Sequence, residues 1–146
     1  MKFLTLLLSA TLFLVAPEAY SRDTAHNFSI QDALQSSDFK EKLDPSIRLY
    51  FGKQGHSKVK HSYGNVSTNK KTNAFNKKDE EACRWVLLSA LISLQQRAKK
   101  DGGNAVINIT SNYKKKKMSS TSEYECHAGN ILAGVALTGD IVILAK

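Results

Sequence analysis

Residues 79–107 read DEEACRWVLLSALISLQQRAKKDGGNAVI and predict a long helix followed by a strand. Asn76 or Asp79 can cap the start of this helix, where acidic side chains also suit the positive end of the helix dipole. Gly102 and Gly103 end it, because glycine readily takes the left-handed conformation of a helix C-cap. Apolar side chains recur along one face at helical spacing, at Cys83, Leu87, Ala90, Leu91, Leu94 and Ala98.

The chain after this helix predicts the strands of a sheet, because apolar and polar residues alternate between turn signals. The predicted elements are a strand over 105–110, a hairpin tip over 113–121, and strands over 122–127, 131–137 and 141–144, the last two separated by a turn over 138–140. Together with the helix they indicate the α+β class, with one main helix packed on an antiparallel sheet.

The chain before the helix is more polar. Ser29 can cap a short helix, with Asp32 three residues later as in a capping box, and Pro45 stops a second short helix. The predicted elements are a loose segment over 22–27, a short helix after Ser29, a second over 37–43, strands over 47–51 and 59–66, and an ordered loop over 68–78.

Residues 1–21 have the parts of a secretory signal peptide. Lys2 gives a positive start, residues 3–15 are an apolar run, and Ala19-Tyr20-Ser21 places small residues before a cleavage site. The apolar run is too short for a stable transmembrane helix, and no cysteine follows it as a lipid attachment point. We therefore expect a soluble periplasmic or secreted protein without a transmembrane anchor.

Residues 22–146 have a length that suits a single domain. We place the short helices in residues 22–45, and the sheet and main helix in residues 46–146. The chain carries 21 Lys and Arg against 13 Asp and Glu, a formal charge of +8, and loss of residues 1–21 removes one charge of each sign. This charge favours an anionic partner such as a lipid head group, an envelope polymer or a nucleic acid, or it serves solubility alone.

Cys83 and Cys126 are the two cysteines of the chain, and export to an oxidising compartment favours a disulfide between them. In the chain-entropy view, closing so long a loop stabilises the fold by about 4 kcal/mol at most. A zinc site would need a Cys-x-x-Cys pair or clustered histidines, which the sequence lacks. A catalytic thiol would need a positioned histidine, but His127 next to Cys126 points to the other face of its strand.

The run Lys114-Lys115-Lys116-Lys117 is the densest charge in the chain. It predicts a weak anion-binding site for phosphates or head groups, or else a solvated hairpin tip whose lysines discourage edge-to-edge aggregation. The pairs Lys70-Lys71 and Lys77-Lys78 can extend it to one basic face. Four aromatic residues near the basic segments either stack on bases or pack in the core: Tyr63, Phe75, Tyr113 and Tyr124.

The sequence shows no motif of a catalytic or cofactor site. It has no G-x-S-x-G elbow of a serine hydrolase and no G-x-x-x-x-G-K-[ST] loop for nucleotides. The acidic residues at 79–81 are explained by the helix start. The histidines are not spaced as metal ligands, at His26, His56, His61 and His127. We therefore predict no catalytic residue, no metal and no cofactor.

Three segments carry a resemblance to a known group of proteins: NKKTNAF at 69–75, DEEAC at 79–83 and GGNAVINI at 102–109. They are similar to a family of short exported bacterial proteins that often carry the label "excinuclease ATPase subunit". The resemblance extends over most of residues 22–146. The ATPase activity in the label does not carry over, because a repair ATPase needs a phosphate-binding loop, a cytoplasmic address and a far longer chain.

Residues 80–146 resemble the YbjQ-like domains and the signalling domain of the Rcs envelope-stress lipoprotein. The shared order is a helix ending in GGNAVI at 102–107, a hairpin, a strand of small residues and a terminal strand. In that lipoprotein a cysteine before the helix bonds one in the strand after the hairpin, and Cys83 and Cys126 match this arrangement. The chain lacks the lipidated cysteine and the second disulfide, so anchoring and Rcs signalling are not implied.

These observations lead us to expect a non-enzymatic, soluble periplasmic protein that binds an anionic envelope component or a protein partner, with a role in stress response. The lysines at 114–117 are the expected contact surface. An exported nucleic-acid-binding protein is the first alternative, and steep salt dependence with DNA would favour it. An exported hydrolase is the second, and activity lost on single substitutions would favour it.

Overall fold

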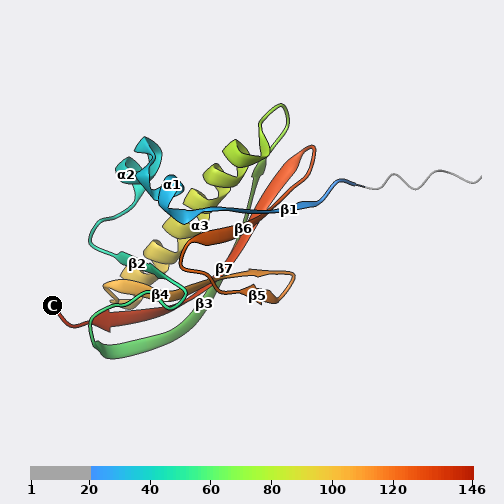
Figure 1. The fold of residues 1–146 in the computed structure, drawn as a ribbon. Coiled ribbons are helices and arrows are strands. Elements are labelled where there is room, and N and C mark those ends of the chain that lie inside the picture. Colours follow the sequence, from blue (N-terminus) through green and yellow to red (C-terminus); the bar gives the residue numbers. More distant parts are fainter. Residues whose placement is uncertain (1–20) are drawn as a thin grey trace, which may run out of the picture.

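The computed structural model describes residues 21–146 (Figure 1). The predicted signal peptide, residues 1–21, therefore lies outside the described residues except for Ser21. A long helix packs on one face of a strongly twisted sheet in Figure 1. The elements are β1 (Thr24–Ser29), α1 (Ile30–Gln35), α2 (Ser37–Lys42), β2 (Arg48–Phe51), β3 (Val59–Asn73), α3 (Asp79–Asp101), β4 (Ala105–Tyr113), β5 (Lys116–Met118), β6 (Glu123–Ala128) and β7 (Leu132–Leu144).

The sheet is mixed and mostly antiparallel. Its strands follow the order β1-β6-β7-β4-β2, while β3 pairs with β7 and β5 pairs with β4. The prediction of an α+β fold with one main helix is confirmed. The prediction of a wholly antiparallel sheet is wrong at one place, because β2 runs parallel to β4. The chain between them passes through β3 and α3, which gives it the length that a parallel connection needs.

Helix α3 buries all six residues of the predicted apolar face, together with Ala82, Val86 and Leu88. Gly102 is its C-cap in the left-handed conformation, with φ 89°, as predicted. The predicted N-cap is wrong. Lys78 takes the cap position without a side-chain hydrogen bond, and Asp79 is the first helical residue. The Asp79 carboxylate does not cap the helix because it is bound by the side chains of Arg22 and His26.

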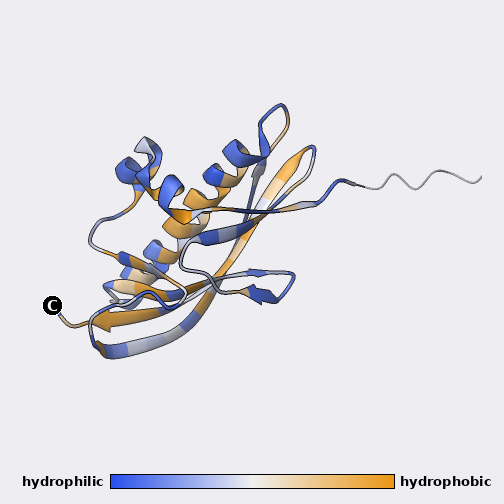
Figure 2. Ribbon diagram, in the orientation of Figure 1, coloured by the Kyte–Doolittle hydropathy of each residue, from blue (hydrophilic) through white to orange (hydrophobic). Residues whose placement is uncertain are grey.

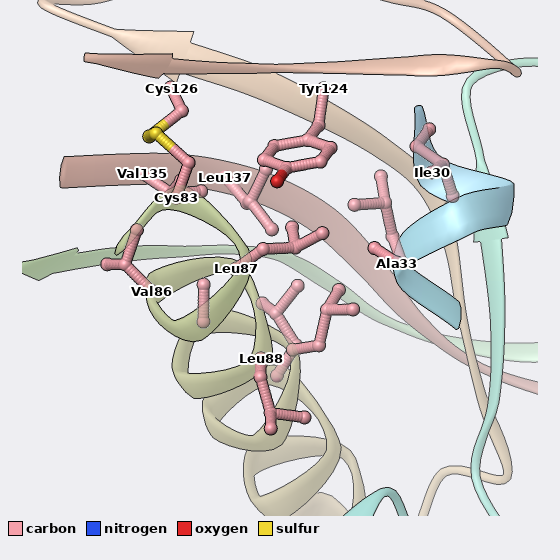
Figure 3. Packing of buried hydrophobic residues seen from close by; sticks show 14 of the residues in the cluster. Ile30, Ala33, Cys83, Val86, Leu87, Leu88, Tyr124, Cys126, Val135 and Leu137 are labelled. Atoms are coloured by element: carbon pink, nitrogen blue, oxygen red, sulfur yellow. A yellow bond between two sulfur atoms is a disulfide. The ribbon is translucent and has the colours of Figure 1, made fainter. Parts of the chain in front are cut away.

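The predicted disulfide between Cys83 and Cys126 is confirmed. It joins α3 near its start to β6, with the two Cα atoms 5.8 Å apart and a sequence separation of 43. Figure 3 shows it beside the side chains of Tyr124 and Val135 in the main core. Both cysteines are fully buried, so the bond ties helix to sheet inside the core.

Strand β7 runs without a break through residues 138–140, where the sequence predicted a turn. The prediction is wrong because both edges of this segment are paired, with β3 on one side and β4 on the other. The carboxylate of Asp140 accepts hydrogen bonds of 2.7 Å from the side-chain amides of Asn65 and Asn108. A residue typical of turns is thus satisfied within the sheet. Figure 2 shows β7 as hydrophobic along most of its length.

Two polar segments also form strands that the sequence did not predict. Residues 24–27, predicted to be loose, form β1 together with Phe28 and Ser29 and pair with β6. Residues 68–73, predicted to be part of a loop, extend β3 as far as the pairing of Asn73 with Leu132. Both strands are polar because much of their surface faces water, so the apolar alternation that signals a strand is weak.

The two short helices are confirmed as α1 and α2, and the Ser29 hydroxyl caps α1 by accepting a hydrogen bond from the Asp32 backbone N–H. The segment after α2 is joined to α3 by a side chain of α3 that the sequence did not single out. The buried Gln95 amide donates to the carbonyls of Asp44 and Ile47 and accepts from the Asp44 backbone N–H. Within residues 21–146, no helix is both long and apolar enough to cross a membrane.

Candidate functional site

Four segments that are distant in sequence meet at one end of the sheet and enclose a groove of about 610 Å³. They are the start of β1, the end of β3, the end of β4 and the β6–β7 turn. In Figure 1 this is the end where the described chain enters, opposite the C-terminus. We call it the end groove and define it by residues that line it: Arg22, Asp23, Lys71, Tyr113, His127 and Ile131.

The floor of the end groove belongs to the face of the sheet that α3 does not cover. Cys126 points toward α3, where it is bonded to Cys83, so the next residue, His127, points to the other face. His127 pairs with Gly134 of β7, and Gly134 pairs with Lys71 of β3. Because Gly134 has no side chain, the space between Lys71 and His127 stays open.

His127 is held on three sides within the end groove. Its Nδ1 lies 3.1 Å from Asp23 Oδ1, and its Nε2 lies 2.8 Å from Glu125 Oε1. Its ring stacks on that of Tyr113, with centroids 3.4 Å apart and an angle of 11° between the planes. With both ring nitrogens engaged by carboxylates, neither is free to take a proton from a substrate.

Lys114, the first of the four predicted anion-binding lysines, is bound to this cluster. Its Nζ lies 3.3 Å from Asp23 Oδ2 and 5.5 Å from the centre of the Tyr113 ring. Desolvation works to raise the pKa of Asp23, but the hydrogen bonds from His127 and Lys114 outweigh it and lower this pKa below its ordinary value. Desolvation also raises the pKa of Tyr113. Lys114 thus fastens the hairpin to the segment before β1.

The other three lysines of the predicted site point into solvent from the hairpin. Lys114 and Lys115 form its two-residue turn with positive φ angles of 49° and 62°, the conformation that a tight hairpin of this kind needs. Lys116 and Lys117 lie in β5 and pair with β4. The prediction of a tip over 113–121 is wrong in its bounds, because the turn is at Lys114 and Lys115 and residues 116–118 return as β5, while β6 pairs with β1 and β7. The structure also gives Lys114 a different position from Lys115, Lys116 and Lys117.

A second cluster secures the start of the described chain. The Arg22 guanidinium donates to both Asp79 oxygens at 2.8 and 2.9 Å, to the Gly129 carbonyl and to the Asn130 side chain. His26 Nε2 lies 2.8 Å from the same Asp79 carboxylate. The sequence predicted a role for Asp79 only at the start of the helix. The sequence holds no signal for this cluster, because its members are brought together by the pairing of β1 with β6.

Seven exposed or half-buried lysines lie in or next to the segments that supply the end groove, although only Lys71 lines it, and they form no ion pair with another residue in the range 21–146. We call them the basic end: Lys70, Lys71, Lys77, Lys78, Lys115, Lys116 and Lys117. Lys71 and Tyr113 both line the groove, so the end of β3 and the base of the β4–β5 hairpin are neighbours. The two lysine groups named from the sequence therefore lie at the same end of the molecule.

The remaining candidate residues have separate positions. Tyr124 is buried in the main core, and burial raises its pKa. His56 contacts the Ser57 carbonyl, and His61 packs edge-on against Tyr63. Among the residues that the structure describes, no group of three or more His, Cys, Asp or Glu is placed to hold a metal ion.

Comparison of the chain with protein-family models, with curated proteins and with solved structures found no match. The family resemblances drawn from the sequence therefore stay predictions.

Proposed function

We propose that this chain is a non-enzymatic protein of the periplasm or cell exterior that binds an anionic component of the cell envelope through its basic end. One observation supports the proposal above all. Two lysine-bearing segments about forty residues apart, the β3–α3 region and the β4–β5 hairpin, meet at one groove, which Lys71 and Tyr113 both line. Lysines scattered only for solubility need not gather in this way.

The local acids do not neutralise the basic end. Asp23 is engaged by His127 and Lys114, and Asp79 is engaged by Arg22 and His26. Glu80 and Glu81, in the first turn of α3, remain exposed beside these lysines. Seven lysines outside ion pairs against two exposed carboxylates leave an excess of positive charge, which attracts anions most strongly at low salt.

The disulfide fits the proposed compartment, because such bonds persist in oxidising spaces outside the cytoplasm. The groove gives the surface a defined shape in addition to its charge. Its walls carry the Tyr113 ring and the Ile131 side chain beside Lys71, a combination that suits a ligand with an anionic group next to an apolar part.

A charge-matched pair of variants tests the proposal. The first changes Lys71, Lys115, Lys116 and Lys117 to Gln, and the control changes Lys53, Lys58, Lys60 and Lys100, which are exposed elsewhere. The probes are inorganic polyphosphate, duplex DNA and vesicles of phosphatidylglycerol with phosphatidylethanolamine. We expect the first variant to bind polyphosphate or vesicles at least about 10-fold more weakly than the native chain, and the control to bind within about 3-fold of it.

Salt provides the second measurement. Binding should weaken steeply between about 50 mM and 200 mM salt, because lysines release bound counterions from the anion. Equal loss in both variants would mean that net charge alone attracts the anion, and would contradict a built basic end. Binding to DNA without binding to polyphosphate or vesicles would support the nucleic-acid alternative in its place.

A further inference from the structure

Large apolar side chains are exposed at four positions in residues 21–146, and three of these lie together. Phe75, Ile131 and Leu132 are 62%, 66% and 51% exposed, respectively. Phe75 follows the end of β3, and the other two lie at the β6–β7 turn. The Ala74 backbone N–H donates to the Ile131 carbonyl at 2.7 Å, so the two turns are joined. We call these three residues the apolar tip.

The fold does not require apolar residues at these positions. Ile131 lies in the short turn closed by the hydrogen bond from Gly129 N–H to the Leu132 carbonyl. Such turns favour Gly, Asn, Asp or Ser, and a side chain exposed there adds little to the core. A single exposed apolar residue is ordinary, but a cluster surrounded by polar residues marks an interaction surface. Figure 2 shows the hydrophobic colour of β7 continuing toward this turn.

The charge around the apolar tip indicates the kind of partner. Lys77 and Lys78 follow Phe75 by two and three residues in the chain, and Lys71 lines the end groove together with Ile131 and Leu132. The apolar tip therefore has lysines close to it. This combination suits the surface of a bilayer, where acyl chains lie beneath anionic head groups. Long lysine side chains can reach the head groups while the apolar residues enter the boundary below.

The apolar tip is also held in place before any partner binds. Arg22 bonds to the Gly129 carbonyl and the Asn130 side chain in the β6–β7 turn, and to Asp79 at the start of α3. The disulfide fixes the start of α3 to β6 near the same end. Pre-ordering both turns lowers the entropy cost of binding.

We infer that the apolar tip inserts into the surface of an anionic lipid bilayer, with the basic end contacting the head groups. This inference rests on the proposed function and names lipid as the anionic partner. The tip has too few apolar residues to anchor the protein without charge, so docking should need both and should be reversible.

Vesicle flotation tests the inference with the exported protein. The variant Phe75→Ser/Ile131→Ser/Leu132→Ser removes the apolar tip without changing charge, and Tyr63→Ser is the matched control at the fourth exposed position. We expect the triple variant to bind phosphatidylglycerol-containing vesicles on the order of 30-fold more weakly, and Tyr63→Ser to bind like the native chain. The intact mass of each protein records whether residues 1–21 remain. Because the native and variant chains are the same in this respect, a difference in their vesicle binding is due to the apolar tip.

Insertion has its own measurement. Phe75→Trp should shift its fluorescence to the blue with anionic vesicles and be quenched by brominated acyl chains, beyond the signal of the single native Trp85. Native-like vesicle binding by the triple variant, with no blue shift in Phe75→Trp, would overturn the inference.

If polyphosphate binding persisted in that case, the proposed function would stand. If the native chain bound neither polyphosphate nor vesicles, both the inference and the proposed function would fail. A dimer in sedimentation equilibrium that the triple variant abolishes would assign the tip to a second copy and also overturn the inference.

Discussion

Asp79 is the residue at which the start of α3 meets the segment before β1. Arg22 donates two hydrogen bonds to its carboxylate, and His26 Nε2 lies 2.8 Å away. The hydrogen bond from Arg22 is the largest cause that lowers the pKa of Asp79 from 3.8 to about 2. A carboxylate whose pKa falls on folding stabilises the folded state above its unfolded pKa, and this contribution is lost as pH falls through the folded pKa.

We therefore expect Asp79→Asn to lower the free energy of unfolding at pH 7 by about 1 kcal/mol, a modest value because the pair is partly exposed and water screens it. The difference from the native chain should shrink between about pH 4 and pH 2, as the native carboxyl becomes protonated. Urea unfolding over this pH range measures it. Glu81→Gln, in the same helical turn, is the control for the helix dipole. A difference that persists unchanged at pH 2 would show that charge at Asp79 is not the cause.

Strand β7 is an element in which the local sequence predicts the wrong structure. Thr138-Gly139-Asp140 has the composition of a turn, yet it continues the longest strand pairing in the sheet. The glycine serves close packing instead of a turn. A Cβ at Gly139 would lie 2.6 Å from Val106 Cγ1, closer than two carbon atoms can approach without a shift.

Gly139→Ala should accordingly destabilise the fold by about 1–3 kcal/mol, because neighbouring residues must move to admit the methyl group. Gly55→Ala is the matched control, since no atom lies within 4 Å of the position that its Cβ would take. Thermal or urea unfolding compares the two variants. Equal stability of both would mean that β7 and β4 separate at no cost, contrary to the packing seen here.

For the whole molecule, the disulfide is the covalent link between the helix layer and the sheet. Cys83 and Cys126 are 43 residues apart in sequence, so the bond restricts the unfolded chain over a long loop. Both sulfur-bearing side chains also fill space in the core. The disulfide lies near the basic end and the apolar tip. Its loss should therefore destabilise the whole fold and also make these two surfaces less ordered.

The variant Cys83→Ala/Cys126→Ala should lose up to about 4 kcal/mol of unfolding free energy. Urea unfolding of this variant, and of the native chain with and without reductant, measures the loss. Reductant should bring the native chain close to the variant and leave the variant unchanged. Intact mass under non-reducing conditions should show two hydrogens fewer than the free dithiol, and two free thiols in protein isolated from an oxidising compartment would contradict the bond.

The sequence by itself determined the elements whose causes are local. Helix α3 follows from apolar residues at helical spacing and ends at Gly102, whose conformation depends on its own backbone. The short helix α1 follows from the Ser29 cap. The disulfide followed from an even cysteine count and the predicted signal peptide.

Only the tertiary structure decided what depends on partners distant in sequence. β1 and the end of β3 are strands because β6 and β7 pair with them, and β2 is parallel because the chain returns to β4 after α3. The same pairings bring Asp23 to His127, and Lys71 to the groove that Ile131 also lines. Polar residues have no periodic apolar pattern to reveal such contacts, because the free energy that orders them comes from the neighbouring strand and not from their own sequence.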